Sequence, residues 1–327
     1  MVQTEDEIGD WPLPRAGEQD LLDAAPWLSR QSALTLPLAD AALAVGRLDA
    51  DLAGLDETRR AGFLRRLALA EVEALLWVLG RPLARDEIGR DLMDARATSD
   101  LEAMRFARWA IRRLEGQGGE SLRDFLGLHS QPPTGAAMPR LTGDSFDDAA
   151  LVFAEAMGHA QGLHPLSRAP FALLAWRMTE LSPPEEATAE ALVWIARDMA
   201  RGCEALTFLP IAAETRRTRS DAGPVEGRME AHLTALTAGA RAARLLLRRV
   251  DEWQDRALRA TQPVKGNSPA RVIEVLAAHP LVSAPDVEKA TGLSRITSER
   301  MLNRLEDLQQ IREITGTRRF RLWTARL

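Results

Sequence analysis

Apolar residues recur at helical spacing along most of the chain, and this pattern predicts a body made of helices. The first clear repeat is "LADAALAVGRLDADLAGL" at residues 38–55, where apolar positions fall three or four residues apart, as on one face of a helix. Further repeats of this kind cover residues 60–80, 84–95, 99–117, 147–163, 168–181, 185–206 and 225–260. No convincing strand pattern precedes residue 311, so the body is expected to be all-α.

The last sixty or so residues carry the pattern of two helices joined by a short turn. The stretch "VSAPDVEKATGL" predicts a short helix that Ser283 caps and that ends at Gly292. Ser294 then caps a longer helix, whose apolar residues Leu302, Leu305 and Leu308 are expected to face inward. Two helices joined by a turn that contains glycine are typical of a helix-turn-helix.

A hairpin is predicted directly after this helix pair. The residues "IREITGTRRFRLW" at 311–323 alternate apolar and basic positions around a Thr-Gly turn. With the preceding helical segment "SPARVIEVLAAHP", this makes three helices and a wing. The expected fold is therefore mainly α: a helical bundle followed by a C-terminal winged helix-turn-helix with a small β-hairpin.

Proline-rich and polar segments divide the 327 residues, a length that suits two or three domains. The expected units are an irregular N-terminal segment (1–36), an N-terminal helical domain (37–126), a second helical region ending in a long helix (145–262), and the winged helix-turn-helix (265–327).

The outer face of the longer helix carries the candidate side chains for reading DNA. They are Arg295, Thr297, Arg300, Asn303 and Arg304. Arginine and asparagine can pair bidentately with guanine and adenine edges in the major groove. The hairpin adds Arg318, Arg319 and Arg321, which are expected to meet phosphates. Glu299, Glu306 and Asp307 argue against this interpretation, since they would repel a DNA backbone that they faced.

The charge distribution favours a polyanionic partner at the C-terminus. Residues 265–327 contain eleven Lys/Arg and seven Asp/Glu, a net charge of +4. Because the whole chain has a net charge of −5, the preceding 264 residues carry −9. A basic unit on an acidic body predicts double-stranded DNA as the partner, although ordinary fluctuation in a small domain gives the same count.

Composition and the N-terminus predict a soluble, cytoplasmic protein. The single Cys203 excludes an intrachain disulfide, and "MVQTEDEIGDW" lacks the apolar core of a signal peptide. No uncharged run approaches the roughly 20 apolar residues of a membrane span. His159 and His164 are five residues apart, off the spacing at which a helix shares a metal ion. We expect no metal, no cofactor and no membrane association, and the sequence identifies no small-molecule effector.

The long helix at 225–260 leaves the oligomeric state open. Its apolar side and its arginines suit a dimer stalk, and helix-turn-helix proteins usually bind two half-sites. The same side could instead pack back onto its own body. The sequence slightly favours a homodimer.

The order of segments resembles an alphaproteobacterial family, common on rhizobial plasmids, that joins an uncharacterised helical domain to a dedicated C-terminal helix-turn-helix DNA-binding domain. The resemblance runs from "PLADAALAVGRLDADL" through "FALLAWRM" to "ITGTRRFRLW". It implies a DNA-binding regulator.

The body also resembles Fic proteins, which transfer AMP to protein hydroxyls. The residues "HPLSRAPFA" at 164–172 stand where the Fic motif HPFx(D/E)GNGR would fall. In that motif the histidine is the general base, the acid helps hold a metal ion, and the glycines and asparagine wrap phosphates. His164 remains here, but Arg168 takes the acidic position, and Ala169, Pro170 and Phe171 replace the phosphate-binding residues.

A second Fic motif is altered as well. Where Fic proteins carry the regulatory SSxIEG, "LLWVLG" at 75–80 has Leu79 in place of the inhibitory glutamate. The resemblance implies a Fic-like body with a degenerate site, so we expect no catalysis; a chance His-Pro pair between unrelated helices is the alternative. Residual AMP transfer or nucleotide binding at His164, and a protein-interaction scaffold, remain as other functions.

Overall fold

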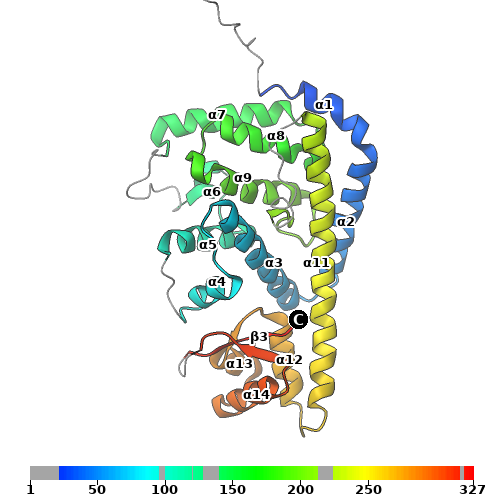
Figure 1. Ribbon diagram of the computed structural model, residues 1–327, viewed down its shortest axis with the longest axis vertical. Helices are drawn as coiled ribbons and strands as arrows, with labels where there is room; N and C mark the ends of the chain where they lie inside the picture. Colours follow the sequence, from blue (N-terminus) through cyan, green and yellow to red (C-terminus); the bar gives the residue numbers. More distant parts are fainter. Residues whose placement is uncertain (1–21, 96–99, 120, 128–139, 213–223, 317–319) are drawn as a thin grey trace, which may run out of the picture.

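The computed structural model describes residues 22–95, 100–119, 121–127, 140–212, 224–316 and 320–327. These residues form an elongated helical body with a smaller unit at its lower end (Figure 1). The helices of the body are α1 (Ala25–Gln31), η1 (Ser32–Leu34), α2 (Thr35–Ala53), α3 (Glu57–Val78), α4 (Arg85–Leu92), α5 (Leu101–Leu114), α6 (Leu122–Leu126), α7 (Gly143–His159), α8 (Pro165–Met178), α9 (Pro184–Met199), η3 (Ala200–Gly202) and α11 (Val225–Thr261). None of the described helices is long and apolar enough to cross a bilayer.

Helix α11 runs along the molecule and joins the body to the lower unit (Figure 1). Its apolar face packs against α1, α2 and α8, where Met229, Leu233 and Leu236 are fully buried. Leu245 of the same helix is 46% exposed. The apolar side of the long helix therefore packs onto its own chain, which was the alternative to a dimer stalk, and the homodimer stays a prediction.

The N-terminal segment differs from the expectation of irregular chain over residues 1–36. The part that is described is helical from Ala25 onward. Pro26 occupies the first turn of α1, where a missing N–H costs no intrahelical hydrogen bond. Trp27 is buried, and its ring meets that of Phe171 edge-on at 5.8 Å. Burial of this large side chain holds the segment against α8.

The lower unit has the predicted winged helix-turn-helix topology. It comprises α12 (Ser268–Ala278), β1 (Val282–Ser283), α13 (Ala284–Thr291), α14 (Arg295–Asp307), β2 (Ile311–Glu313) and β3 (Leu322–Ala325). The strands form an antiparallel sheet in the order β1-β3-β2, with Trp323 opposite both Val282 and Glu313. The hairpin is confirmed, whereas β1 was not expected, because two residues are too short to show alternation.

The hydrophobic core of the lower unit begins inside α11. Val250, Trp253 and Ala257 of this helix are buried together with residues of α12, α13 and α14. The indole of Trp253 also donates a hydrogen bond to the carbonyl oxygen of Gln310, at 2.7 Å. The last turns of α11 thus form one wall of the lower unit and also connect it to the body.

Polar contacts fix the lower unit on α3 and α4. The buried guanidinium of Arg66 donates to the carbonyl oxygens of Leu276, Ala277 and His279, at 2.6, 3.0 and 2.8 Å. These are carbonyls at the C-terminal end of α12, which lack partners within their own helix. Arg312 of β2 forms a bidentate ion pair with Asp86 of α4. Body and unit therefore share an ordered joint.

Candidate nucleic-acid interface

Helix caps set the angle between α13 and α14. Ser283 and Asp286 form a capping box, in which the Ser283 N–H donates to the Asp286 carboxylate at 2.8 Å. Helix α13 ends at Gly292, whose φ of +65° is a left-handed conformation that glycine adopts without strain. The Ser294 hydroxyl then accepts the N–H of Thr297 and starts α14. All three predicted turn residues are confirmed.

Helix α14 presents a broad exposed face. Ser298, Met301, Leu302 and Leu305 are buried against the unit's core. At about 100° per residue, the exposed positions fall on the opposite side of the helix. They are Arg295, Ile296, Glu299, Arg300, Asn303, Arg304 and Asp307. The exposed face of α14 therefore holds four of the five predicted residues of this helix.

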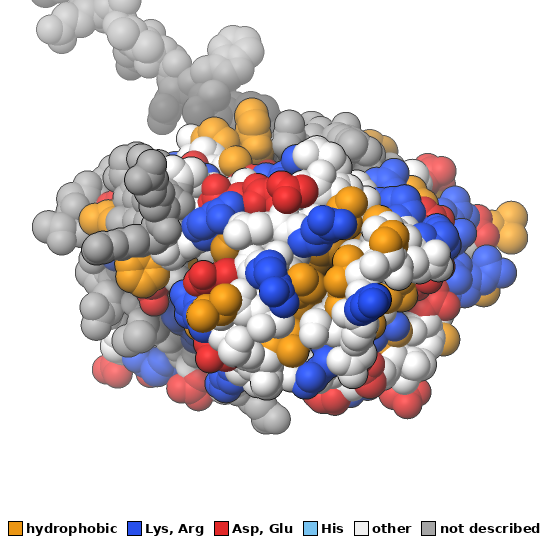
Figure 2. Space-filling view, turned by 90° about the horizontal axis from the view of Figure 1, so that it is seen from below, with side chains coloured by type: hydrophobic (Ala, Val, Ile, Leu, Met, Phe, Trp, Pro, Cys, Tyr) orange, Lys and Arg blue, Asp and Glu red, His pale blue; other side chains and the backbone are white. Residues whose placement is uncertain are grey.

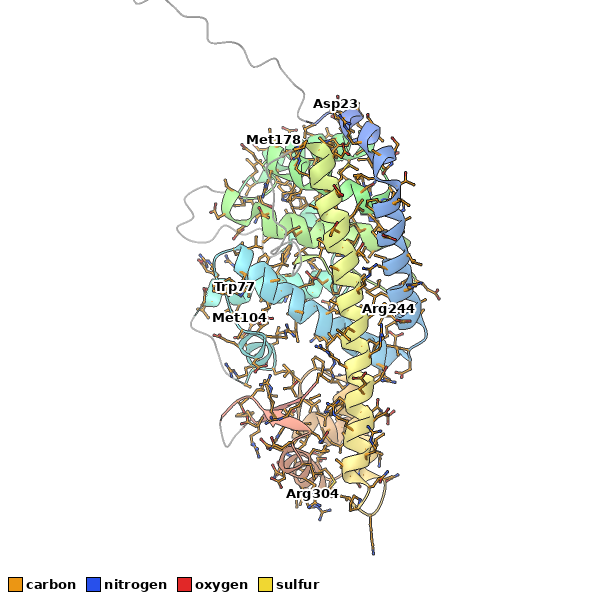
Figure 3. The ribbon with its side chains drawn as sticks, turned by 45° about the vertical axis from the view of Figure 1, so that its right-hand side comes forward. Asp23, Trp77, Met104, Met178, Arg244 and Arg304 are labelled. Carbon is orange, nitrogen blue, oxygen red and sulfur yellow. The ribbon has the colours of Figure 1, made fainter. Side chains whose placement is uncertain are left out.

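Arg300 and Arg304 are the cations of this face that are free to bind a ligand. Both are exposed, and neither forms an ion pair with any residue of the described ranges. Arg304 lies at the lower end of the molecule and points away from the body (Figure 3). The view from below shows basic side chains spread over this end, among apolar and a few acidic ones (Figure 2). A guanidinium without a carboxylate partner can meet a phosphate or a base without first breaking an ion pair.

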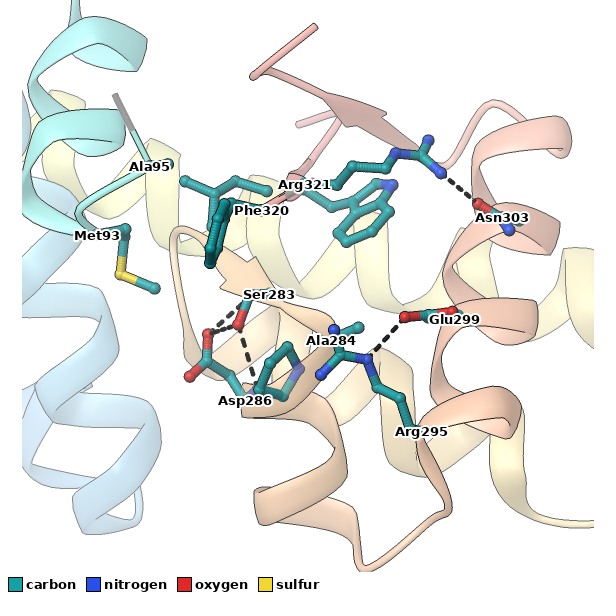
Figure 4. A pocket seen from close by; sticks show the side chains of 13 residues that line it. Met93, Ala95, Ser283, Ala284, Asp286, Arg295, Glu299, Asn303, Phe320 and Arg321 are labelled. Carbon is teal, nitrogen blue, oxygen red and sulfur yellow. Dashed lines mark hydrogen bonds and ion pairs between the residues drawn. The ribbon is translucent and has the colours of Figure 1, made fainter. Parts of the chain in front are cut away.

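Two other predicted residues are held by carboxylates of α14 itself. Arg295 forms an ion pair with Glu299 at 2.7 Å. Arg321 of the hairpin donates to Asn303 Oδ1 and to Glu306 Oε2, both at 2.9 Å, and Figure 4 shows the first of these bonds beside the Arg295–Glu299 pair. The acidic residues Glu299 and Glu306 are thus neutralised by neighbouring arginines, which weakens the argument that they would repel DNA.

The remaining predicted residues differ in position. Thr297 is half-buried and belongs to the cap of α14, since its hydroxyl lies 2.9 Å from that of Ser294. Arg318 and Arg319 lie outside the described residues, so their contact with phosphate stays a prediction. Arg321 comes from the same hairpin and stacks on the Trp323 ring, with 4.6 Å between guanidinium carbon and ring centroid.

A cavity of about 700 Å³ separates α14 from the hairpin and the end of α4 (Figure 4). Arg295, Glu299 and Asn303 line it from α14, opposite Phe320 and Trp323 of the hairpin. On one side of this cavity, Arg321 and Trp323 of the hairpin donate hydrogen bonds to Asn303 and Glu306 of α14.

Three residues outside the sequence prediction join this surface. Ile296 is 79% exposed and Phe320 is 78% exposed, and an exposed apolar side chain on a recognition helix can contact a thymine methyl group. Arg271 of α12 is exposed, and its Nη2 lies 3.8 Å from the position of a Cβ on Gly292, at the turn before α14. Ile296 could have been found from the sequence, because it is an apolar residue that lies off the buried face of its helix. Arg271 could be placed beside this surface only once the fold was known.

His164 caps a helix. Its Nδ1 accepts the N–H of Leu166 at 3.2 Å at the start of α8, and burial lowers the pKa of its ring. Arg168, at the acidic Fic position, pairs with Asp198 at 2.6 Å. The residues at the phosphate-binding positions, Ala169, Pro170 and Phe171, lie inside α8, where backbone N–H groups bond within the helix.

Comparison with known proteins identifies the lower unit. A Fic family protein from Desulfovibrio desulfuricans G20, whose crystal structure is solved, is similar over 89% of this chain and 96% of its own, with a TM-score of 0.49 and 15% identity. No curated protein matches the chain. Residues 270–325 match the family model described as a helix-turn-helix DNA-binding domain. This segment, from α12 to the end of the sheet, is therefore similar to helix-turn-helix DNA-binding domains.

Proposed function

We propose that the chain is a cytoplasmic, sequence-selective double-stranded DNA-binding protein that regulates transcription. The observation that carries the proposal is the exposed face of α14, where Arg300 and Arg304 have no ion-pair partner among the described residues. The match of residues 270–325 to DNA-binding domains supports the same function.

We expect the side chains of this surface to have separate roles. With α14 in the major groove, Arg300 and Asn303 reach base edges, and Ile296 offers an apolar surface to thymine. Arg271 and the N-terminus of α14 lie together at the turn, where positive charge and helix dipole both favour a phosphate. Base contacts then give selectivity, and phosphate contacts give affinity that falls with salt.

Fluorescence anisotropy with a duplex selected from a random pool tests this function. We expect Arg300→Ala to cost about 1–3 kcal/mol on the selected duplex and to relax base preference at one position. Arg271→Ala should weaken selected and unrelated duplexes alike. Arg105→Ala, which removes an exposed arginine from α5, is the matched control and should bind as the native chain does.

Binding that stays unchanged in the double variant Arg300→Ala/Arg304→Ala would remove α14 from the interface and overturn the proposal. A domain that served only as a protein-docking module would select no duplex from the pool.

We propose further that His164 performs no nucleotidyl transfer. The Nδ1 of this ring is engaged by the Leu166 N–H, and Arg168 supplies a cation where the Fic reaction needs a metal-binding carboxylate. Labelled ATP incubated with the chain and a mixture of proteins should leave no label on protein. Labelling that His164→Ala abolishes would show an active site there.

A further inference from the structure

A small pocket lies in the joint between the body and the DNA-binding domain. Its volume is about 270 Å³. Its walls come from α3, α4 and α11 of the body, and from β2, β3 and the α12–β1 connection of the domain. A ligand in this pocket would touch both parts of the molecule at once.

Cations dominate the lining of this joint pocket. Four arginines, Arg66, Arg85, Arg249 and Arg312, line it together with one carboxylate side chain, Asp86. Asp86 is already engaged in the bidentate ion pair with Arg312. Arg85 forms an ion pair with Glu73 of α3, so the positive charge that remains uncompensated comes from Arg66 and Arg249.

Two of these four arginines, Arg66 and Arg249, form no ion pair with a carboxylate of the described residues. Arg249 of α11 is exposed and forms no ion pair within the described part of the chain. Arg66 is only 6% exposed and donates to neutral carbonyl oxygens alone, while its buried Nε has no hydrogen-bond acceptor among the described residues. Burial lowers the pKa of Arg66 to about 10. A buried cation without a counter-charge is costly, and an anion placed beside it recovers part of that cost.

We propose that the joint pocket binds a small oxyanion, the phosphate or carboxylate group of a metabolite. The guanidinium fork offers parallel N–H donors that match both groups. The volume is below the 300–1,000 Å³ typical of pockets for drug-sized ligands, so the ligand is only a few heavy atoms in size. The site is separate from the exposed face of α14 and from His164.

Calorimetric titration of the full chain with inorganic phosphate, and separately with succinate, tests the site. Sodium chloride of matched ionic strength corrects for general screening. We expect saturable binding of one of the two anions and a rise in the thermal midpoint that chloride does not produce. Phosphate binding assigns the phosphate class, and succinate binding assigns the carboxylate class.

Arg249→Ala and Arg248→Ala form the decisive pair, because both remove an exposed arginine from α11 and only Arg249 lines the pocket. Arg249→Ala should weaken binding at least ~10-fold, the order of one charge-assisted hydrogen bond, while Arg248→Ala binds as the native chain does. Absence of saturable binding by both anions, or equal loss in both variants, would overturn the proposal. Because the titration contains no DNA, its outcome is independent of whether the chain binds a duplex.

Discussion

The arginines of α14 differ in what surrounds each guanidinium. Arg300 and Arg304 face solvent without an ion-pair partner among the described residues, whereas Arg295 is held by Glu299 at 2.7 Å. An arginine in an exposed ion pair can exchange its carboxylate for a phosphate, but it must first lose a contact worth up to about 1 kcal/mol. Glu299 thus limits how strongly the wing side of α14 attracts DNA.

Glu299→Gln should therefore tighten duplex binding. The change frees Arg295 and removes a negative charge from the exposed face of α14, so we expect the affinity to rise ~3- to 10-fold, with a salt dependence steeper by about one counterion. Anisotropy titrations at several salt concentrations measure both. Glu252→Gln makes the same change at an exposed position of α11 and should have little effect. Weaker binding by Glu299→Gln would mean that Glu299 itself contacts DNA, as an acceptor from cytosine.

His232 on α11 links stability to pH. Its Nε2 is buried without a hydrogen-bond partner in the described structure, and burial lowers its pKa from 6.5 to about 4. Between these two pH values the unfolded chain binds the proton that the folded chain excludes. The free energy of unfolding should therefore fall as the pH is lowered from about 6.5 to 4, by up to about 3 kcal/mol. Urea unfolding at pH 7.5 and pH 5 measures it.

Two variants separate the contribution of His232 to the pH dependence of stability from that of the carboxylates, which also bind protons in acid. His232→Gln should make the loss between the two pH values smaller than in the native chain. His159→Gln, at an exposed position of α7, should leave the loss unchanged. Equal pH dependence in all three proteins would contradict the assignment.

At the scale of elements, the sequence predicted best where the signal is local. The capping box at Ser283, the exit at Gly292 and the cap at Ser294 are each set by neighbours within three or four residues, and each is confirmed. The short strand β1 was not predicted, because it is defined by its pairing with β3, which is distant in the sequence. Two residues at the joint, Gly62 and Arg66, were not predicted either, since their neighbours across the joint lie more than two hundred residues away in the sequence.

The turn between α13 and α14 depends on the backbone of Gly292. An alanine there would have to hold a φ of +65°, which costs roughly 1 kcal/mol. Gly292→Ala should lower the free energy of unfolding by about that amount. Gly46→Ala, in the interior of α2 with open space around its Cβ, should raise it by about 0.5–1 kcal/mol. Changes of opposite sign in the free energy of urea unfolding would show that the backbone conformation at the glycine, rather than the added methyl group itself, determines the effect of the substitution.

At the scale of the whole molecule, the winged helix-turn-helix unit is built onto the body. Its core extends into α11 through Trp253, and Arg66 closes the C-terminal end of α12 from the body side. Loss of one such contact should therefore be transmitted to the whole domain, because its helices share one core. An anion in the joint pocket would act on the same contacts.

Gly62 of α3 is where the two parts come closest. A Cβ at this position would lie 1.3 Å from the carbonyl oxygen of Ala278, and a backbone atom cannot move aside as a flexible side chain can. Gly62→Ala should therefore push α12 off α3 and speed amide hydrogen exchange throughout α12 and α14, while α7 and α8 exchange at native rates. Gly46→Ala introduces the same methyl group without a neighbour within 4 Å and should not speed exchange in either region. Native exchange in α12 of Gly62→Ala would mean that the joint is loose enough to absorb a methyl group, and that the body does not hold the domain in place.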